Sequence, residues 1–414
     1  MRPPGSVLRV LYVCDFASIH ARDLIDAVSR HPDIDITVLT SRAAAPMANV
    51  RMLSLFEHAG RPRPAWLLAI ADRSRAALER YPRLLRRAWA REVSREADLI
   101  AARLLHLAAD EKPDAVHALR VLPEGIAALA LCDRWPDVPL VTSVWGQDLI
   151  FFARAASTLG KRTSALMKRV DVLLPDTERD AILARDEFGL RAAAHIRVIP
   201  GPGGLDIPAL QRQALSEPRK IAGRPAISCF RAWTADTFAA TYLLDALADL
   251  RTTHPDAHLH LVAPDRPRRV TEIRRRIAAL GLDRAVSLRV GHMPHGQVME
   301  QMQAGAINVL VGATDGLPMT MLESMYWGQV QVALNRSSYI PPLNDGINAA
   351  LFDSIDGSAI AEGLRRAITL IPRRVEIQRD NRTLLAARYS RAAGVAEIAE
   401  LYRGAAAGKG GVPA

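Results

Sequence analysis

The chain has 414 residues, 49% of them hydrophobic, and a formal net charge of +10 that comes mainly from arginine. This length favours two domains, and the hydrophobic content is enough to bury a sizeable core. The positive charge fits an anionic substrate or an anionic membrane surface, or reflects the composition of the source. Nucleic acid is the least supported partner, because the sequence shows no helix-turn-helix signature and no aromatic-interleaved basic segment.

Few cysteines, no metal-binding pattern and no long apolar run limit the class of protein further. Cys14, Cys132 and Cys229 are odd in number and lie in apolar surroundings, which predicts free thiols in a reducing compartment. No CxxC or HExxH pattern occurs, so no structural metal is indicated. Because residues 1–9 lack a signal core and no run of about 18 apolar residues follows, we expect a cytoplasmic protein.

The N-terminal segment predicts a parallel, doubly wound sheet. Residues 7–14 and 34–40 are apolar, β-branched runs, and residues 22–29 between them have helical character. Ligands of such sheets bind beyond the carboxyl ends of the strands. The loop after the first strand, which leads through His20 to Arg22, is therefore a candidate binding loop, although His20 can also be an ordinary surface histidine.

Residues 65–108 predict a long helix with one apolar stripe, including Leu78, Leu85 and Trp89, and arginines over the rest of its surface. A basic amphipathic helix can lie on an anionic bilayer at the inner face of a membrane. Packing of the stripe on the domain core is the alternative that we favour.

A strand, a loop and a helix start between Val311 and Gly328 predict an anion site. Unpaired amides and the positive end of the helix dipole converge at such a junction. Gly316 permits close approach of a ligand, and Pro318 suits a first helical position. Asp315 lies in the loop, and two turns of helix bring Glu323 towards the same side.

This stretch, T-D-G-L-P-M-T-M-L-E-S-M-Y-W-G, resembles the donor-sugar motif of GT-B glycosyltransferases of the family 4 (group 1) type. The family motif reads E-x7-E, and Asp315 stands in place of the first glutamate. Strand ends earlier in the chain also resemble the family: His117 matches "D-V-V-H", and Gly146 and Asp148 match "H-G-x-D", with Trp145 in place of the histidine. The resemblance implies an α/β GT-B fold, with two Rossmann-like doubly wound domains that face a central cleft.

The resemblance also implies roles for residues. Arg231 would bind the donor diphosphate, Asp315 the donor sugar and Glu323 the ribose. Further donor contacts would come from Gly316, Leu317, Pro318, Met319, Thr320, Gly291 and His292. Acceptor contacts would come from His20, Arg22, His117, Trp145 and Asp148. The family's phosphate-binding lysine is missing, because its place falls near Phe238.

Four segments are predicted from the same resemblance. Residues 1–205 would bind the acceptor and residues 206–385 the nucleotide-sugar. Residues 386–403 would form a helix that crosses back to the first domain, and 404–414 a disordered tail. The Gly- and Pro-rich residues 200–206 suit a hinge between the domains.

The expected activity is transfer of a sugar, with retention of configuration, from a UDP- or GDP-sugar to a hydroxyl of a glycan, a lipid-linked acceptor or a small molecule. We expect no metal and no cofactor, and a place in polysaccharide biosynthesis. One alternative is a catalytically silent GT-B module that binds a sugar nucleotide or a partner glycosyltransferase, which the changes at Trp145 and Phe238 favour. A sugar-nucleotide epimerase is a third, weaker reading.

Overall fold

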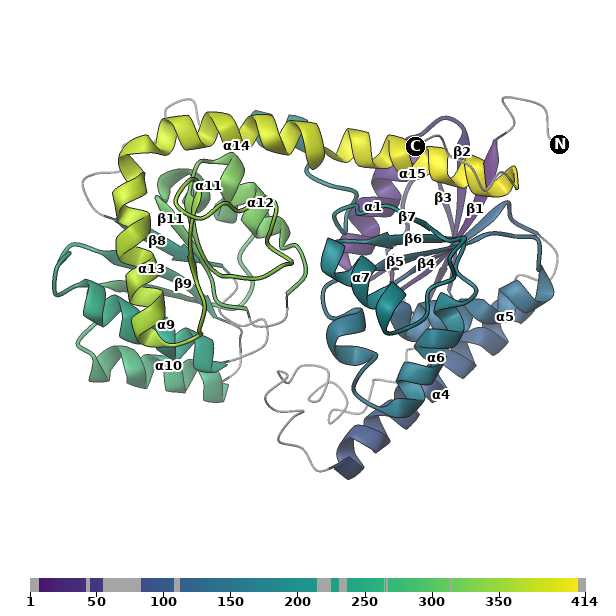
Figure 1. The fold of residues 1–414 in the computed structure, drawn as a ribbon, viewed down its shortest axis with the longest axis horizontal. Coiled ribbons are helices and arrows are strands. Elements are labelled where there is room, and N and C mark those ends of the chain that lie inside the picture. Colours follow the sequence, from purple (N-terminus) through teal and green to yellow (C-terminus); the bar gives the residue numbers. More distant parts are fainter. Residues whose placement is uncertain are drawn as a thin grey trace. The chain divides into compact units, whose positions relative to one another are not determined.

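The computed structural model describes residues 7–41, 45–54, 83–107, 112–213, 225–230, 237–263, 265, 267–312 and 315–408. These residues form two compact units (Figure 1). Unit 1 contains the described residues up to Gly204 and those from Arg391 onward, and unit 2 contains Leu205–Ser390. None of the helices in these ranges is long and apolar enough to cross a membrane.

Unit 1 is built on a sheet of seven parallel strands in the order β3-β2-β1-β4-β5-β6-β7. The order reverses between β1 and β4, as in a doubly wound sheet. The strands are β1 Leu8–Cys14, β2 Ile34–Thr40, β3 Val50–Ser54, β4 Ala115–Leu119, β5 Leu140–Val144, β6 Val172–Pro175 and β7 His195–Ile196.

Helices cover both faces of this sheet. One core lies under α4, α5 and α6, and the other lies under α1 and α15 (Figure 1). The elements are α1 Ile19–Ser29, α4 Arg83–Leu107, the π-helical turn η1 Val121–Gly125, α5 Ile126–Arg134, the π-helical turn η2 Asp148–Phe152, α6 Ser157–Met167, α7 Glu178–Asp186 and α15 Arg391–Ala406.

The apolar stripe of α4 packs on the core, as we favoured. Trp89, Ile100 and Leu104 are buried in the same cluster as β4 and α5. Leu78 lies outside the described residues. The three cysteines are buried free thiols, as predicted.

Unit 2 is also a parallel sheet, with six strands in the order β10-β9-β8-β11-β12-β13. The strands are β8 Ala226–Cys229, β9 His258–Ala263, β10 Val286–Val290, β11 Ile307–Leu310, β12 Val330–Leu334 and β13 Ala349–Phe352. The predicted α/β class, with two doubly wound parallel sheets, is confirmed.

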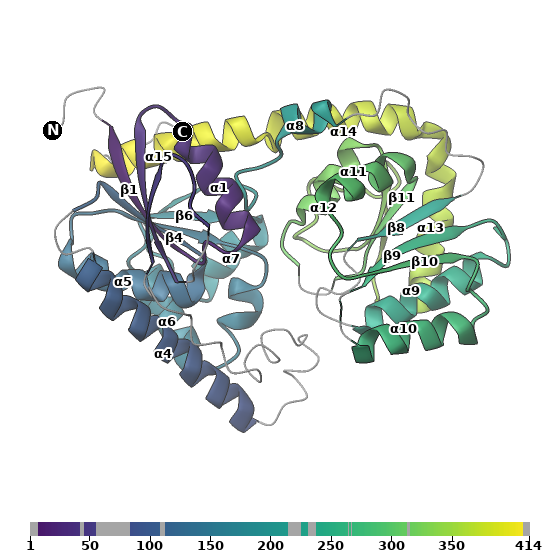
Figure 2. The same cartoon turned by 180° about the vertical axis from the view of Figure 1, so that it is seen from behind.

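The helices of unit 2 divide between two cores. Helices α9, α10 and α13 cover one face of the sheet, and α8, α11, α12 and α14 pack on the other face (Figure 2). Their bounds are α8 Ile207–Arg212, α9 Thr237–Leu250, α10 Pro267–Ala279, α11 His295–Ala304, α12 Met319–Tyr326, α13 Gly357–Leu370, the 3-10 turn η3 Ile371–Arg373 and α14 Arg374–Arg388.

The C-terminal helix corrects one prediction. The disordered tail was expected from residue 404, but α15 continues to Ala406, and a turn follows to Gly408. Alanine has the highest helix propensity of all residues, so the run of alanines after Gly404 extends the helix. The residues beyond 408 are outside the description.

Gly394 lets α15 lie directly against the backbone of unit 1. A Cβ atom at this position would lie 2.1 Å from the carbonyl oxygen of Gly203 and 3.1 Å from its carbonyl carbon. Backbone cannot yield as a flexible side chain can. We therefore expect Gly394→Ala to lower the free energy of unfolding by roughly 1–3 kcal/mol, the cost of overpacking, as measured by urea denaturation.

Gly296 offers the matched control for this substitution. It also lies in a helix, α11, but no atom lies within 4 Å of the added Cβ. Gly296→Ala should therefore stabilise the protein by roughly 0.5–1 kcal/mol. If both substitutions changed stability equally, the close approach of α15 would not be the cause.

Candidate functional site

The predicted donor element lies at the carboxyl end of the unit 2 sheet. Strand β11 ends at Leu310, and α12 begins at Met319 after a loop whose residues 313 and 314 are not described. Pro318 is the N-cap of α12 with an extended backbone, not its first helical residue as predicted. Its fixed φ and its missing N–H suit the cap as well as the first turn. Asp315, Met319 and Thr320 are half-buried, and Gly316, Leu317 and Pro318 are buried.

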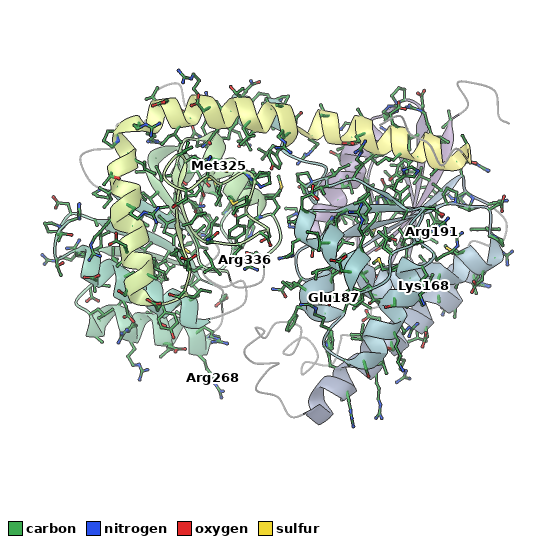
Figure 3. The ribbon with its side chains drawn as sticks, in the orientation of Figure 1. Lys168, Glu187, Arg191, Arg268, Met325 and Arg336 are labelled. Atoms are coloured by element: carbon green, nitrogen blue, oxygen red, sulfur yellow. The ribbon has the colours of Figure 1, made fainter. Side chains whose placement is uncertain are left out.

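The connection after β12 holds this loop. The guanidinium of Arg336 donates to the carbonyl oxygen of Gly312 at 2.7 Å, and the hydroxyl of Ser338 donates to that of Asp315 at 3.1 Å. Arg336 and Met325, which lies on α12, are labelled in Figure 3. The connection after β12 thus holds the loop at Gly312 and at Asp315.

A buried polar cluster joins α12 to strands β11 and β12. The amide of Asn308 on β11 donates to the hydroxyl of Ser324 at 3.1 Å and to the side-chain oxygen of Gln331 on β12 at 2.8 Å. Ser324 also donates to the same oxygen of Gln331 at 3.1 Å. These bonds tie the helix to two strands, so that the position of Glu323 one residue earlier is set by the sheet.

Glu323 faces a partner that the sequence did not reveal. Its Oε1 lies 2.9 Å from Nε2 of His295, the first residue of α11. The Glu323 side chain is 13% exposed and that of His295 is 56% exposed. The only signal in the sequence was that His295 follows closely after His292, a predicted donor contact.

The other predicted donor residues lie after β10, the edge strand of the sheet, or outside the described residues. Gly291 follows β10, has φ +85° and donates to the carbonyl of Ala263 at the end of β9. The backbone carbonyl of the next residue, His292, accepts from Arg289. Arg231 lies outside the described residues, and so does the side chain of Phe238. In the described ranges no three His, Cys, Asp or Glu side chains are placed to hold a metal ion.

In unit 1 the structure brings two predicted acceptor residues together. His20 is exposed, Trp145 is half-buried, and their rings meet edge to face with centroids 6.3 Å apart. They follow β1 and β5, which both end at the carboxyl edge of the sheet. Arg22 stacks on the ring of Phe16, with its Cζ 5.2 Å from the ring centroid.

His117 is not available to an acceptor, which corrects the prediction. It is fully buried, with Nδ1 2.6 Å from the hydroxyl of Tyr402 and Nε2 2.9 Å from that of Ser143. Burial lowers the pKa of His117 to about 3, so the ring is neutral. The strand was predicted to end at this residue, but β4 continues to Leu119. His117 therefore faces the core under α15.

The prediction that Asp148 contacts the acceptor is also corrected, because its carboxylate is fully buried and hydrogen-bonded within the protein. Its Oδ1 accepts from Nε and Nη2 of Arg120, at 3.1 and 2.7 Å. Its Oδ2 accepts from the backbone N–H groups of Val121 and Trp145, at 3.2 and 3.3 Å. The residue joins the ends of β4 and β5 and has no surface for a ligand.

Arg120 and Glu124, two residues that follow β4, were not singled out from the sequence. Arg120 has φ +93°, in the left-handed region that favours glycine. Glu124 is 2% exposed; its Oε1 accepts from the hydroxyl of Ser41 at 3.3 Å, and its Oε2 has no partner among the described residues. Burial raises the pKa of the Glu124 carboxyl to about 7, against the opposing charge of Arg120. The sequence could have suggested them only as an arginine and a glutamate in the segment after a predicted strand.

Comparisons with known proteins agree with this arrangement. A family model described as glycosyl transferases group 1 matches residues 224–369, and one described as glycosyl transferase 4-like matches residues 88–176. Together they span more than half of the chain. No curated protein matches by sequence.

Solved structures share the fold over almost the whole chain. Sucrose-phosphate synthase from Thermosynechococcus elongatus has a TM-score of 0.70 at 15% identity, over 97% of this chain and 99% of that one. A UDP-forming trehalose-phosphate synthase from Burkholderia xenovorans has a TM-score of 0.73 at 14% identity, over 97% and 100%. HepE from Anabaena, solved with UDP-glucose, has a TM-score of 0.64 at 16% identity, over 95% and 98%.

At these identities the structural likeness shows the fold, and the two family models show the family. With the two doubly wound sheets, they lead to one conclusion. The chain belongs to the group 1 glycosyltransferases of the GT-B fold.

Proposed function

We propose that this glycosyltransferase moves a sugar from a UDP- or GDP-sugar to a hydroxyl acceptor, with retention of configuration and without a bound metal or cofactor. The observation that carries the proposal is the β11–α12 element, in which Asp315, the start of α12 and Glu323 follow one strand end. The structural relatives solved with UDP-glucose, or described as UDP-forming, support a uridine nucleotide as the first donor to test.

Each predicted donor residue then has a role. The backbone N–H groups of Gly316, Met319 and Thr320 and the positive end of α12 stabilise charge on the leaving diphosphate, and the fork of the Arg231 guanidinium adds to this. Asp315 accepts hydrogen bonds from the donor sugar, and Glu323 accepts them from the ribose hydroxyls. Gly291 and His292 follow β10, the edge strand of the same sheet, and border the nucleotide.

Glu323 gives the first test of these roles. We expect Glu323→Gln to weaken UDP binding by roughly 1.5–3 kcal/mol, the value of a hydrogen bond to a charged group. This corresponds to roughly a ten- to hundredfold rise in Kd, measurable by isothermal titration calorimetry. Glu400→Gln removes the same charge from an exposed position of α15 and should leave Kd unchanged. Equal Kd values for wild type and Glu323→Gln would contradict the role.

Metal dependence is a second test. The protein itself supplies positive charge for the diphosphate, so we expect release of nucleoside diphosphate from the donor, in the presence of its acceptor, to continue in EDTA at an unchanged rate. A loss of activity that Mg²⁺ or Mn²⁺ restores would show that this part of the proposal is wrong.

The proposed function itself is tested by turnover. A thermal-shift screen of UDP- and GDP-sugars finds the donor, because binding to the native state raises stability. Release of nucleoside diphosphate only when an acceptor is added identifies a transferase, and the NMR coupling of the product's anomeric proton reports retention. Glycans, lipid-linked sugars and small hydroxyl compounds are the acceptors to try, with and without anionic vesicles, given the net charge of +10.

The substitution of tryptophan for histidine at Trp145 favours a second candidate, a silent module that binds a sugar nucleotide or a partner enzyme. The intact pair of Asp315 and Glu323 opposes it. A silent module would bind the nucleotide-sugar but release no diphosphate with any acceptor. Conversion of the UDP-sugar into its epimer without an acceptor would instead indicate an epimerase.

A further inference from the structure

Three neighbouring strands of unit 1 end in polar residues at one edge of the sheet. Asp15 follows β1, Ser41 follows β2 and Arg120 follows β4, and these strands are adjacent in the order β2-β1-β4. In doubly wound sheets ligands bind at the carboxyl edge near the point where the strand order reverses, which here lies between β1 and β4. Neither family model nor the predicted acceptor residues assigned a role to Ser41, Arg120 or the nearby Glu124.

Glu124 is a side chain at this edge with one carboxylate oxygen that lacks a hydrogen-bond partner in the described part of the chain. One carboxylate oxygen accepts a long bond from the hydroxyl of Ser41 at 3.3 Å, and the other, Oε2, has no hydrogen-bond partner among the described residues. The residue is 2% exposed. Buried carboxylate oxygens are normally paired, so a buried one without a partner points to a donor that binds here.

Arg120 supplies a donor beside this acceptor. Its backbone has a positive φ, and its Nε and Nη2 donate to the carboxylate of Asp148. Its third nitrogen, Nη1, forms no hydrogen bond with the described part of the chain, and the side chain is 39% exposed. Arg120 also exerts the largest charge effect on Glu124. The edge therefore offers one hydrogen-bond acceptor, Glu124 Oε2, and one donor, Arg120 Nη1.

The charges select the class of ligand. Asp15, Glu124 and Asp148 are the carboxylates whose charges act on Arg120, and Glu96 and Asp15 add negative charge near Glu124. An ionised phosphate or carboxylate has no proton to donate to Glu124 Oε2, and the ionised Glu124 carboxylate would repel it. Vicinal hydroxyls of an uncharged sugar fit instead, because one hydroxyl can donate to the carboxylate while its neighbour accepts from the guanidinium.

We propose that Glu124 and Arg120 bind the acceptor of the reaction, and that this acceptor is an uncharged sugar whose hydroxyl donates to Glu124 Oε2. That the bound sugar is the acceptor rests on the proposed glycosyl transfer. That a sugar binds at Glu124 and Arg120 does not depend on it. Glu124 is here a binding residue, and the proposal assigns it no proton transfer.

Saturation-transfer NMR on the full chain tests the site without a donor. The probes are D-glucose, D-mannose and D-galactose, each compared with D-glucose 6-phosphate. We expect at least one of the three uncharged sugars to bind wild type and Glu400→Gln equally. Glu124→Gln should bind it about tenfold more weakly or not at all, because a hydrogen bond to a charged oxygen is lost. Glu124→Asp, which keeps the charge but withdraws it by one methylene, should also bind more weakly.

Three outcomes would overturn the proposal. The first is that none of the uncharged sugars binds wild type, which would mean that a structural water or nothing at all occupies Oε2. The second is equal binding by wild type, Glu124→Gln and Glu124→Asp. The third is tighter binding of glucose 6-phosphate than of glucose, which would show an anion site. Circular dichroism melts accompany each variant, and if Glu124→Gln fails to fold, Glu124→Asp decides the result.

Turnover separates this proposal from the proposed function. If UDP-sugar is turned over, Glu124→Gln should raise the KM of the sugar acceptor about tenfold and leave the Kd of UDP unchanged. Turnover with an unchanged acceptor KM would refute the acceptor site and leave the function standing. Sugar binding that depends on Glu124, without turnover of any nucleotide-sugar, would leave the site standing and refute the function.

Discussion

Replacing Arg120 by methionine is expected to lower the free energy of unfolding by about 3 kcal/mol, near the lower end of the range for breaking a buried ion pair. Asp148 has no exposed surface and would keep only the two backbone N–H groups of Val121 and Trp145 as partners. The Arg120 side chain is 39% exposed, so solvent screens part of the attraction, which is why the lower end applies. Urea denaturation at neutral pH measures the effect.

Arg154 provides the control for this experiment. It pairs with Glu187, and both side chains are 42% exposed. A pair of this exposure contributes about 0–1 kcal/mol, so Arg154→Met should change stability little. If the two arginine variants lost the same stability, the buried carboxylate of Asp148 would not be the reason for the effect at Arg120.

Replacing Glu124 by glutamine is expected to change stability in a way that depends strongly on pH. The native pKa of Glu124 is about 7, raised by burial from the ordinary 4.5, so the native state binds this proton more tightly than the unfolded state does. The glutamate therefore destabilises the native state progressively as pH rises from about 4.5 to about 7. One pKa unit corresponds to about 1.4 kcal/mol, so the full effect is about 3 kcal/mol.

Glutamine cannot ionise and does not incur this cost. The stability of Glu124→Gln relative to wild type should therefore increase by about 3 kcal/mol between pH 4.5 and pH 8, as followed by urea denaturation across that range. Glu400→Gln, on the exposed side of α15, should show a difference that hardly depends on pH. A flat difference for Glu124→Gln would mean that the carboxyl titrates normally and is not desolvated.

The two predictions concern one edge of one sheet. A carboxylate that is buried, lacks a partner at one oxygen and lowers stability at neutral pH is the kind of group that proteins retain at functional sites. Arg120 and Asp148 form the support beside it, and their bonds join the ends of β4 and β5. Stability measurements therefore probe the same residues as the sugar-binding experiment.

The predicted donor half of the site is local in sequence, so the motif alone was enough to propose it. Asp315, Glu323 and the start of α12 lie within a few residues of one strand, and the motif places them without reference to the rest of the fold. His295 was not predictable as the partner of Glu323, because it is 28 residues away and meets it only through the packing of α11 on α12.

Two predicted acceptor residues, His117 and Asp148, are buried because of contacts that the sequence does not show. The pattern "D-A-V-H" located the strand but not its end, and a shift of two residues moves His117 from the edge of the sheet into the core. Its partner Tyr402 is 285 residues away on α15. Asp148 was recognised as a motif residue, but its partner Arg120 lies on a different strand end.

By itself, the sequence determined the α/β class, the two doubly wound sheets and the free cysteines, and it predicted a donor element, because hydrophobic periodicity and short motifs depend on neighbours within a few residues. Only the tertiary structure decided which polar side chains at the strand ends are exposed and which are bonded inside the protein. That choice depends on strand order and on the exact residue at which each strand ends, since successive side chains of a strand point to opposite faces. Burial and pairing at this edge follow from contacts between distant segments, and they single out Glu124, which the sequence motif did not mark.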